Sequence, residues 1–204
     1  MNNNKVLEIK NLGMTYHTLD GETKALENIS LDIHRGEIVV LVGPSGCGKS
    51  TLLSIIAGLL KPSNGKVILN NREVKNPTKD IGYMFQRDNL FEWRTIRNNA
   101  LIGLEIQDKV TEDAKSFVES LLDMYGLDEF KDHYPSQLSG GMRQRAALIR
   151  TLATKPDFLL LDEPFSALDY QTRLVISDEI GQILKKEGKT ALMVTHDIAE
   201  AMFT

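Results

Sequence analysis

Residues 43–50 read Gly43-Pro44-Ser45-Gly46-Cys47-Gly48-Lys49-Ser50, with glycines at the first and sixth positions and Lys-Ser at the end. This is the pattern of a phosphate-binding loop. The loop needs glycine because its backbone N–H groups must turn inward and approach phosphate oxygens closely. Lys49 would bring a positive charge to the terminal phosphates, and the Ser50 hydroxyl could bind Mg²⁺. The stretch predicts a nucleotide site made by these eight residues and by Thr51 after them.

The residues on either side of the loop support this interpretation. Residues 37–42 form a continuous apolar run, as expected for a strand that is buried on both faces. Residues 49–60 favour an apolar helix, which would direct its positive N-terminal end at the phosphates. The alternative is a chance loop of this form that binds nothing, and the flanking strand and helix disfavour it.

The rest of the chain alternates between strand and helix patterns. Strands are expected at residues 6–10, 25–33, 66–69, 81–85, 157–161 and 190–194, and helices at 142–153 and 171–186. From about residue 95 to 135 the pattern is helical, and one apolar stripe with core character comprises Ala114, Phe117, Val118, Leu121, Leu122 and Tyr125. We therefore predict an α/β fold whose mainly parallel sheet is interrupted by a helical insert.

A second motif is the run Phe158-Leu159-Leu160-Leu161-Asp162-Glu163. An apolar strand that ends in two acids places their carboxylates at the carboxyl edge of a parallel sheet, where ligands bind. We expect Asp162 to hold Mg²⁺, directly or through water. We expect Glu163 to orient and polarise an attacking water. The alternative is a strand that ends in solvated acids.

A third motif resembles the signature sequence of ATP-binding-cassette (ABC) ATPases, usually written LSGGQ; here it reads Leu138-Ser139-Gly140-Gly141-Met142-Arg143-Gln144-Arg145. Ser139 and the Gly140 and Gly141 amides open a helix, which makes a second anion site. The resemblance implies that this surface binds the γ-phosphate of ATP held by the opposite subunit. Met142 stands where the commonest form has glutamine, and this is similar to a variation of importer ATPases. The alternative is a glycine N-cap without a ligand.

Four single residues match further motifs of the family in its order. Gln86, after the strand at 81–85, resembles the glutamine that senses Mg²⁺ and couples to the membrane partner. Asp169, which ends Ser166-Ala167-Leu168-Asp169, resembles the loop through which the two subunits communicate. His196 resembles the switch histidine at the γ-phosphate, although a lone histidine is more often a surface or capping residue. Tyr16 resembles the aromatic residue that stacks on adenine, and ordinary packing is its alternative.

The resemblance covers essentially the whole chain and carries implications for fold and site. It implies one ABC ATPase domain over residues 1–204, with a P-loop NTPase core, a mainly parallel sheet, an N-terminal antiparallel β portion and an α-helical subdomain inserted at about residues 95–136. It implies ATP and Mg²⁺ as cofactors. The implied catalytic residues are Lys49, Gln86, Glu163 and His196, and the implied metal-site residues are Ser50, Gln86 and Asp162.

The resemblance also implies partners. These are a second ATPase subunit in a head-to-tail dimer, transmembrane permease subunits and, indirectly, a solute-binding protein, at the cytoplasmic face of the membrane. The likeness is greatest to the ATPases of nitrate, sulfonate, taurine and related importers, and it rests on the signature and on residues 85–96, which read FQRDNLFEWRTI. Glu92 occupies a place where that group often has proline. The sequence stops at Thr204 inside an expected helix, which predicts a shortened chain.

Composition and charge bear on the competing functions. The chain has 204 residues and a formal net charge of −4, which is not the basic footprint of a nucleic-acid binder. Its one cysteine, Cys47, allows no intramolecular disulfide, and no apolar run reaches the roughly 18 residues needed to span a bilayer. Two alternatives remain: an ABC ATPase that remodels nucleic acid or ribosomes, and a regulatory subunit that binds nucleotide without turnover. The negative charge disfavours the first, and Glu163 disfavours the second.

Overall fold

The computed structural model describes residues 4–19, 21–165, 169–186 and 188–197. Its elements, in chain order, are β1 (Lys5–Thr18), β2 (Gly21–His34), β3 (Ile38–Val42), α1 (Lys49–Ile56), β4 (Asn64–Leu69), β5 (Arg72–Glu73), β6 (Ile81–Met84), α2 (Ile96–Ile106), α3 (Glu112–Met124), the 3₁₀ helices η1 (Asp128–Phe130) and η2 (Pro135–Gln137), α4 (Gly140–Ala153), β7 (Phe158–Asp162), α5 (Tyr170–Lys186) and β8 (Thr190–Thr195).

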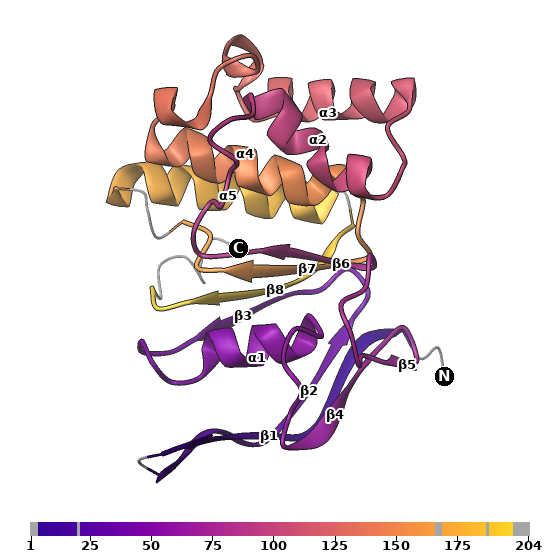
Figure 1. Cartoon of the computed structure of the whole chain (residues 1–204), viewed down its shortest axis with the longest axis vertical. Coiled ribbons are helices and arrows are strands. Elements are labelled where there is room, and N and C mark those ends of the chain that lie inside the picture. Colours follow the sequence, from indigo (N-terminus) through magenta and orange to yellow (C-terminus); the bar gives the residue numbers. More distant parts are fainter. Residues whose placement is uncertain (1–3, 20, 166–168, 187, 198–204) are drawn as a thin grey trace.

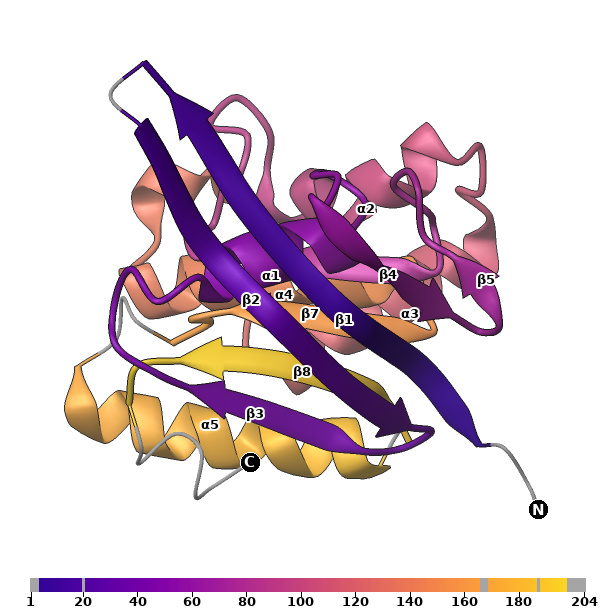
Figure 2. The same cartoon turned by 90° about the horizontal axis from the view of Figure 1, so that it is seen from below.

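The elements stack in layers around a parallel sheet (Figure 1). Strands β3, β8, β7 and β6 lie side by side in that order, and each pair is parallel. Helices α2 to α5 cover one face of this sheet and α1 covers the other. Beyond α1 lies an antiparallel sheet in the order β2-β1-β4-β5, whose β1 and β2 cross beneath the core as two long ribbons (Figure 2). The predicted α/β fold, with an antiparallel portion near the N-terminus and a mainly parallel core, is confirmed.

Strand β7 shows why the apolar runs are continuous. Successive side chains of a strand point to opposite faces of the sheet, and both faces of this sheet are covered. Leu159 and Leu161 pack into the core under the helical layer, whereas Phe158 and Leu160 pack into the core that contains α1 and the antiparallel sheet. Because both faces of β7 are buried, its sequence does not alternate with polar residues.

The helical layer contains the apolar stripe expected in the middle of the chain. Val118, Leu121 and Leu122 of α3 are buried in the core that α4 also lines, and Ala114 and Phe117 pack against it. Helix α3 begins where the Thr111 side chain accepts a hydrogen bond from the backbone N–H of Ala114 at 3.2 Å. The prediction that the stripe is core is confirmed. Among the helices of the described residues, none is both long and apolar enough to cross a bilayer.

The observed elements differ most from the expected ones at β1, β2, α1 and β5. Strands β1 and β2 extend well beyond the predicted segments because they pair with each other over most of their length. Helix α1 ends at Ile56 instead of residue 60, since Gly58 adopts a φ of +73° that reverses the chain, and a Cβ there would overlap the backbone of Asn76. The two-residue strand β5 was not predicted, because so short a strand has no periodicity to detect.

Candidate functional site

The four parallel strands end at one edge of the sheet, and a predicted motif follows each of them. Strand β3 leads into the loop 43–50, β6 into Gln86, β7 ends at Asp162 and is followed by Glu163, and β8 precedes His196. The strand ends are in register, since Val42 pairs with Thr195, Asp162 with Val194 and Leu161 with Met84. Parallel pairing therefore gathers motifs that lie far apart in the sequence at the carboxyl edge, where α/β sheets bind ligands.

The glycine-rich loop has the backbone conformation that its composition predicts. Gly46 and Gly48 have φ values of +81° and +97°, and Gly48 is the N-cap of α1. A Cβ on Gly48 would lie only 2.6 Å from the Ala25 carbonyl oxygen, so no other residue fits there. The loop is tied to the sheet by the Gly43 N–H, which donates to the Thr195 carbonyl at 3.2 Å. Helix α1 therefore starts at the loop with its N-terminal amides available to an anion.

A pocket of about 540 Å³ lies against this loop. Its other walls come from Tyr16, from residues 23–25 of β2, and from Gln86 and Glu163. The Tyr16 hydroxyl lies 3.3 Å from the Thr51 hydroxyl, which joins the antiparallel sheet to α1. The pocket has the size of a small-molecule site. An aromatic ring stands on one wall and the phosphate loop on another, an arrangement that suits a nucleotide.

Lys49 lies across the loop from which it comes. Its ammonium donates to the carbonyl oxygens of Gly43 at 2.7 Å and Pro44 at 3.0 Å. The same Nζ is 3.9 Å from a Glu163 carboxylate oxygen, and the Lys49 side chain is only 9% exposed. An ammonium with three donors can exchange these carbonyls for phosphate oxygens without moving out of the pocket.

Glu163 receives contacts from residues after two other strands. Its Oε2 accepts a hydrogen bond from the Gln86 side-chain amide at 3.0 Å and lies 3.1 Å from His196 Nδ1. The Glu163 side chain is only 12% exposed. Its φ of +46° is unusual for a residue with a Cβ, and its backbone N–H donates to the Val194 carbonyl at 2.9 Å. Strain of this kind collects at functional sites and is maintained by the surrounding contacts.

Asp162 and Ser50 form the candidate metal site. The Ser50 hydroxyl donates to Asp162 Oδ1 at 3.3 Å, and the Tyr83 hydroxyl donates to Oδ2 at 3.4 Å. Burial raises the pKa of Asp162, and the charge of the neighbouring Glu163 acts in the same direction. Adjacent oxygen ligands of an octahedral Mg²⁺ stand about 2.9 Å apart at the usual bond length. The spacing of Ser50 and Asp162 is close to this value, so the pair fits Mg²⁺.

Tyr83 is a residue of the site that sequence reasoning did not single out. It precedes Gln86 by three residues, stacks on Phe85 with ring centroids 4.2 Å apart, and reaches Asp162 from β6. Burial raises its pKa, and the negative charge of Asp162 adds to the effect. No feature of strand 81–85 distinguishes Tyr83 from a packing residue, because its contact with Asp162 depends on the pairing of β6 with β7.

Another group of predicted site residues does not line the pocket. Ser139, Gly140 and Gly141 are at the N-terminus of α4, where the Ser139 side chain accepts from the Met142 N–H at 3.3 Å. Asp169 directly precedes α5. None of these four is among the described residues that line the pocket. The other residues of the predicted communication loop, 166–168, lie outside the described residues. The pocket is therefore formed without the predicted signature residues and without Asp169.

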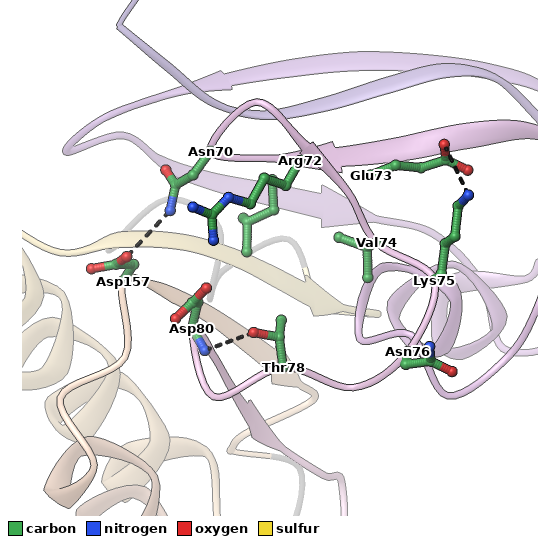
Figure 3. Close-up of a pocket in the computed structure, with 10 residues that line it drawn as sticks. Asn70, Arg72, Glu73, Val74, Lys75, Asn76, Thr78, Asp80 and Asp157 are labelled. Atoms are coloured by element: carbon green, nitrogen blue, oxygen red, sulfur yellow. Dashed lines mark hydrogen bonds and ion pairs between the residues drawn. The ribbon is translucent and has the colours of Figure 1, made fainter.

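A second depression, of about 520 Å³, lies between the β4–β5 turn and the segments before β6 and β7 (Figure 3). The Asn70 amide donates to Asp157 at 3.2 Å, and Lys75 lies 3.8 Å from Glu73. This depression is at the amino end of the parallel strands, opposite the edge that carries the motifs. It contains none of the predicted site residues, and its polar groups largely face solvent or one another. The candidate nucleotide pocket is therefore the one at the carboxyl edge.

Cys47 offers a test of the loop. Its side chain is exposed in the phosphate loop, next to the N-terminus of α1. We expect a maleimide reagent to modify Cys47 and block nucleotide binding, and MgATP to slow the labelling at least about tenfold, as occupancy of most sites would. Mass spectrometry of the labelled protein measures the rate. Equal labelling rates with and without MgATP would count against the loop assignment.

Comparison with known proteins is consistent with this geometry. Residues 26–166 match the family described as ABC transporter. The chain is 50% identical over 196 residues to the ABC transporter ATP-binding protein YtlC of Bacillus subtilis, covering 96% of the chain and 75% of that protein. It is 43% identical over 197 residues to the taurine import ATP-binding protein TauB of a Jannaschia species, covering 96% and 74%. Among solved structures, the dimeric ATP-binding cassette MJ0796 in a post-hydrolysis state with ADP and phosphate aligns with a TM-score of 0.85 and 36% identity, covering 97% of this chain and 90% of that one.

Proposed function

The chain belongs to the ABC transporter family as an ATPase, and we propose that it couples MgATP hydrolysis to the import of a small anion through a transmembrane partner. One observation carries this proposal: the phosphate loop, Gln86, Asp162, Glu163 and His196 meet at one sheet edge, while Ser139 to Gly141, at the N-terminus of α4, do not line the pocket there. An ATPase whose signature residues do not reach its own pocket needs a second copy to complete its site.

This division of the motifs fits a head-to-tail dimer. The γ-phosphate of ATP would contact Lys49, Ser50, Gln86 and His196 of one copy. The N-terminus of α4 in the other copy, with Ser139 and Gly141, would supply amide and hydroxyl donors from the opposite side. The ATP-binding cassette MJ0796, which aligns over nearly the whole chain, is dimeric in its post-hydrolysis structure. This likeness supports the same arrangement here.

Glu163 is the proposed centre of the chemistry. Its carboxylate would accept a hydrogen bond from the attacking water and orient it for in-line displacement at the γ-phosphate. Gln86 and His196 already contact the same carboxylate oxygen and fix its direction. Ser50 and Asp162 would hold Mg²⁺, which would supply positive charge to offset the negative charge of the phosphates. The protein itself takes part in little covalent chemistry, so the positioning of water and γ-phosphate accounts for most of the catalysis.

The partner surface is proposed at the segment between β6 and α2. Trp93 is 75% exposed, and its ring lies 5.0 Å from that of Phe91. The buried Asn99 side chain holds this turn, since it accepts from the Phe91 N–H at 2.7 Å and donates to the carbonyls of Phe91 and Arg94. A large aromatic side chain held out from the surface by a rigid turn is typical of a binding anchor. The proposal places the membrane subunit here, at the cytoplasmic face of the membrane.

The Trp93→Ala variant tests this surface. We expect nucleotide affinity to stay within about twofold of the parent, and the free energy of unfolding to change by less than about 0.5 kcal/mol, because the side chain is exposed. Assembly with the membrane subunit should weaken about tenfold to 30-fold, as for an interface hot spot of up to about 2 kcal/mol. Pull-down of the membrane subunit over a concentration series measures this loss.

Ile106→Ala is the matched control. Ile106 is also an exposed apolar residue and lies at the other end of α2. The proposal expects this variant to assemble like the parent. Equal weakening by both variants would indicate a nonspecific effect of surface hydrophobicity. A clear drop in the thermal stability of Trp93→Ala would mean that Trp93 supports the fold instead of the interface.

The experiment that tests the proposed function is affinity purification of the tagged protein from detergent-solubilised membranes. Recovery of an integral membrane protein, together with its stimulation of ATP hydrolysis, supports a transport ATPase. Recovery of ribosomes or RNA would support the alternative of an ABC ATPase that acts on nucleic acid. The net charge of −4 and the import role of the taurine relative favour the first outcome.

A further inference from the structure

The segment that follows β6, residues 86–89 (the Gln86 segment), is attached to α4 by side chains of that helix. The Gln144 amide donates to the Gln86 carbonyl oxygen at 3.2 Å. The Arg150 guanidinium donates to the carbonyls of Asp88 and Asn89, both at 2.7 Å. These bonds are to the backbone, so they hold the path of the segment and not only its side chains. A displacement of α4 would therefore carry the Gln86 segment with it.

Arg143 adds a fourth contact and links the segment to the start of α4. Its Nε donates to the Asp88 carboxylate at 3.1 Å, and its Nη1 donates to the Leu138 carbonyl at 2.8 Å. Leu138 directly precedes Ser139, the N-cap of α4. The network therefore runs from the signature end of the helix to the backbone of Gln86 within one chain.

Gln144 differs from the two arginines because it is buried and only half satisfied. It is 5% exposed, and no donor in the described part of the chain reaches its Oε1. A buried amide oxygen without a donor costs free energy, and most such groups in folded proteins have a partner. The bond that its side chain does make among the described residues is the one to the Gln86 backbone carbonyl.

We propose that Gln144 is a positioning residue for the ATPase reaction: it makes the Gln86 segment follow α4, and thereby sets the distance between the Gln86 amide and Glu163. This inference rests on the proposed function, in which the N-terminus of α4 meets the ATP of the second copy. The Gln86 amide now donates to Glu163 at 3.0 Å. ATP bound by one copy contacts α4 of the other copy. That helix then sets the distance between Gln86 and Glu163 within its own copy.

The consequence is coupling between the two ATP sites of the dimer. Each α4 contacts the nucleotide of the opposite copy and positions Gln86 of its own copy, so occupancy of either site favours the productive geometry of the other. Coupling of this kind is reciprocal and makes ATP hydrolysis cooperative in ATP concentration. We expect nucleotide binding to a single chain to depend little on Gln144, because its own side chain does not line the pocket.

The test uses Gln144→Met, which keeps the side-chain volume and removes the amide. We expect the Hill coefficient for ATP hydrolysis to fall to about 1 and kcat to fall about tenfold to 100-fold, as for a small misplacement of reacting groups. Thr151→Val is the matched control: Thr151 is buried on the same helix, and its hydroxyl donates to the Ala147 carbonyl of that helix at 3.0 Å. The control should keep the parent Hill coefficient and kcat.

The single tryptophan of the chain provides a readout besides activity. Trp93 follows the Gln86 segment by four residues, so its emission should change when ATP draws α4 and the segment into the dimer. In a Glu163→Gln background, which stops turnover, ATP should shift Trp93 emission. Adding Gln144→Met should leave ATP-dependent dimerisation in place and reduce that shift by at least about half, since the segment no longer follows the helix.

The outcomes separate this inference from the proposed function. If Glu163→Gln does not dimerise with ATP, the two-copy site itself is wrong. If it dimerises, but Gln144→Met keeps the parent cooperativity and the full Trp93 shift, only the role of Gln144 is overturned. An equal loss in Thr151→Val would also overturn it, because the effect would then come from α4 stability. Should Gln144→Met fail to fold, Gln144→Asn, whose amide is one methylene too short to reach the Gln86 carbonyl, takes its place with the same expectations.

Discussion

Glu163→Gln lowers ATP hydrolysis by about 10²–10⁴-fold, the usual effect of losing a general base. The variant keeps the shape of the side chain, and its amide oxygen can still accept the hydrogen bond from Gln86 that the carboxylate accepts now at 3.0 Å. What it loses is the negative charge that polarises the attacking water. ATP affinity should therefore stay within about threefold of the parent, or improve, because repulsion between the carboxylate and the γ-phosphate disappears.

The same variant should turn ATP into a stable link between two copies. Without hydrolysis the closed dimer is not reopened by turnover, and a ligand bound across an interface stabilises the assembly by mass action. Size-exclusion chromatography with and without ATP measures this, and turnover assays measure the rate. Near-normal hydrolysis would remove Glu163 from the mechanism. Lost hydrolysis without dimerisation would instead challenge the two-copy site.

Glu73→Gln is the control for this change. Glu73 lies in the depression at the opposite edge of the sheet, and its carboxylate forms an exposed ion pair with Lys75 (Figure 3). The same chemical substitution there should leave hydrolysis and oligomeric state unchanged. A comparable loss in this variant would show that total charge, and not the position of the Glu163 carboxylate, governs the effect.

The positions of the motifs could be predicted because parallel pairing requires them. Once 37–42, 81–85, 157–161 and 190–194 are read as parallel strands, the residues after them must share one edge. The loop 43–50 could be identified from its glycines alone, and Glu163 from its place after a buried strand. The structure then adds that Gln86 and His196 contact one and the same carboxylate oxygen.

Contacts that depend on register or on helix orientation could not be predicted. Tyr83 reaches Asp162 only because β6 pairs with β7 in one particular register. Gln144 and Arg150 reach the Gln86 segment because α4 packs beside β6, and helical periodicity predicts only which residues share a face. The early end of α1 has the same origin, since Gly58 is required by the backbone of Asn76, far along the chain.

Lys49→Met should weaken ATP binding about 100-fold, which corresponds to about 2.7 kcal/mol. A hydrogen bond to a charged partner contributes about 1.5–3 kcal/mol, and an ammonium beside the terminal phosphates can make more than one. Methionine keeps the apolar stem of the buried side chain and removes only the charge and its donors. Stability should change by only about 1 kcal/mol or less, because the Gly43 and Pro44 carbonyls that lose the ammonium lie in an open loop and can bond water instead.

Lys24→Met is the control that distinguishes an effect of the phosphate loop from an effect of positive charge alone. Lys24 lines the same pocket, but it is exposed and pairs only loosely with Glu27 at 3.5 Å. An exposed ammonium contributes little, so its removal should change ATP affinity by less than about threefold. Calorimetric titration with ATP, beside thermal unfolding of the nucleotide-free proteins, measures both quantities. Equal losses in the two variants would mean that ATP senses the general positive charge of the pocket. A Lys49→Met protein that binds ATP like the parent would mean that the loop is not where the terminal phosphates bind.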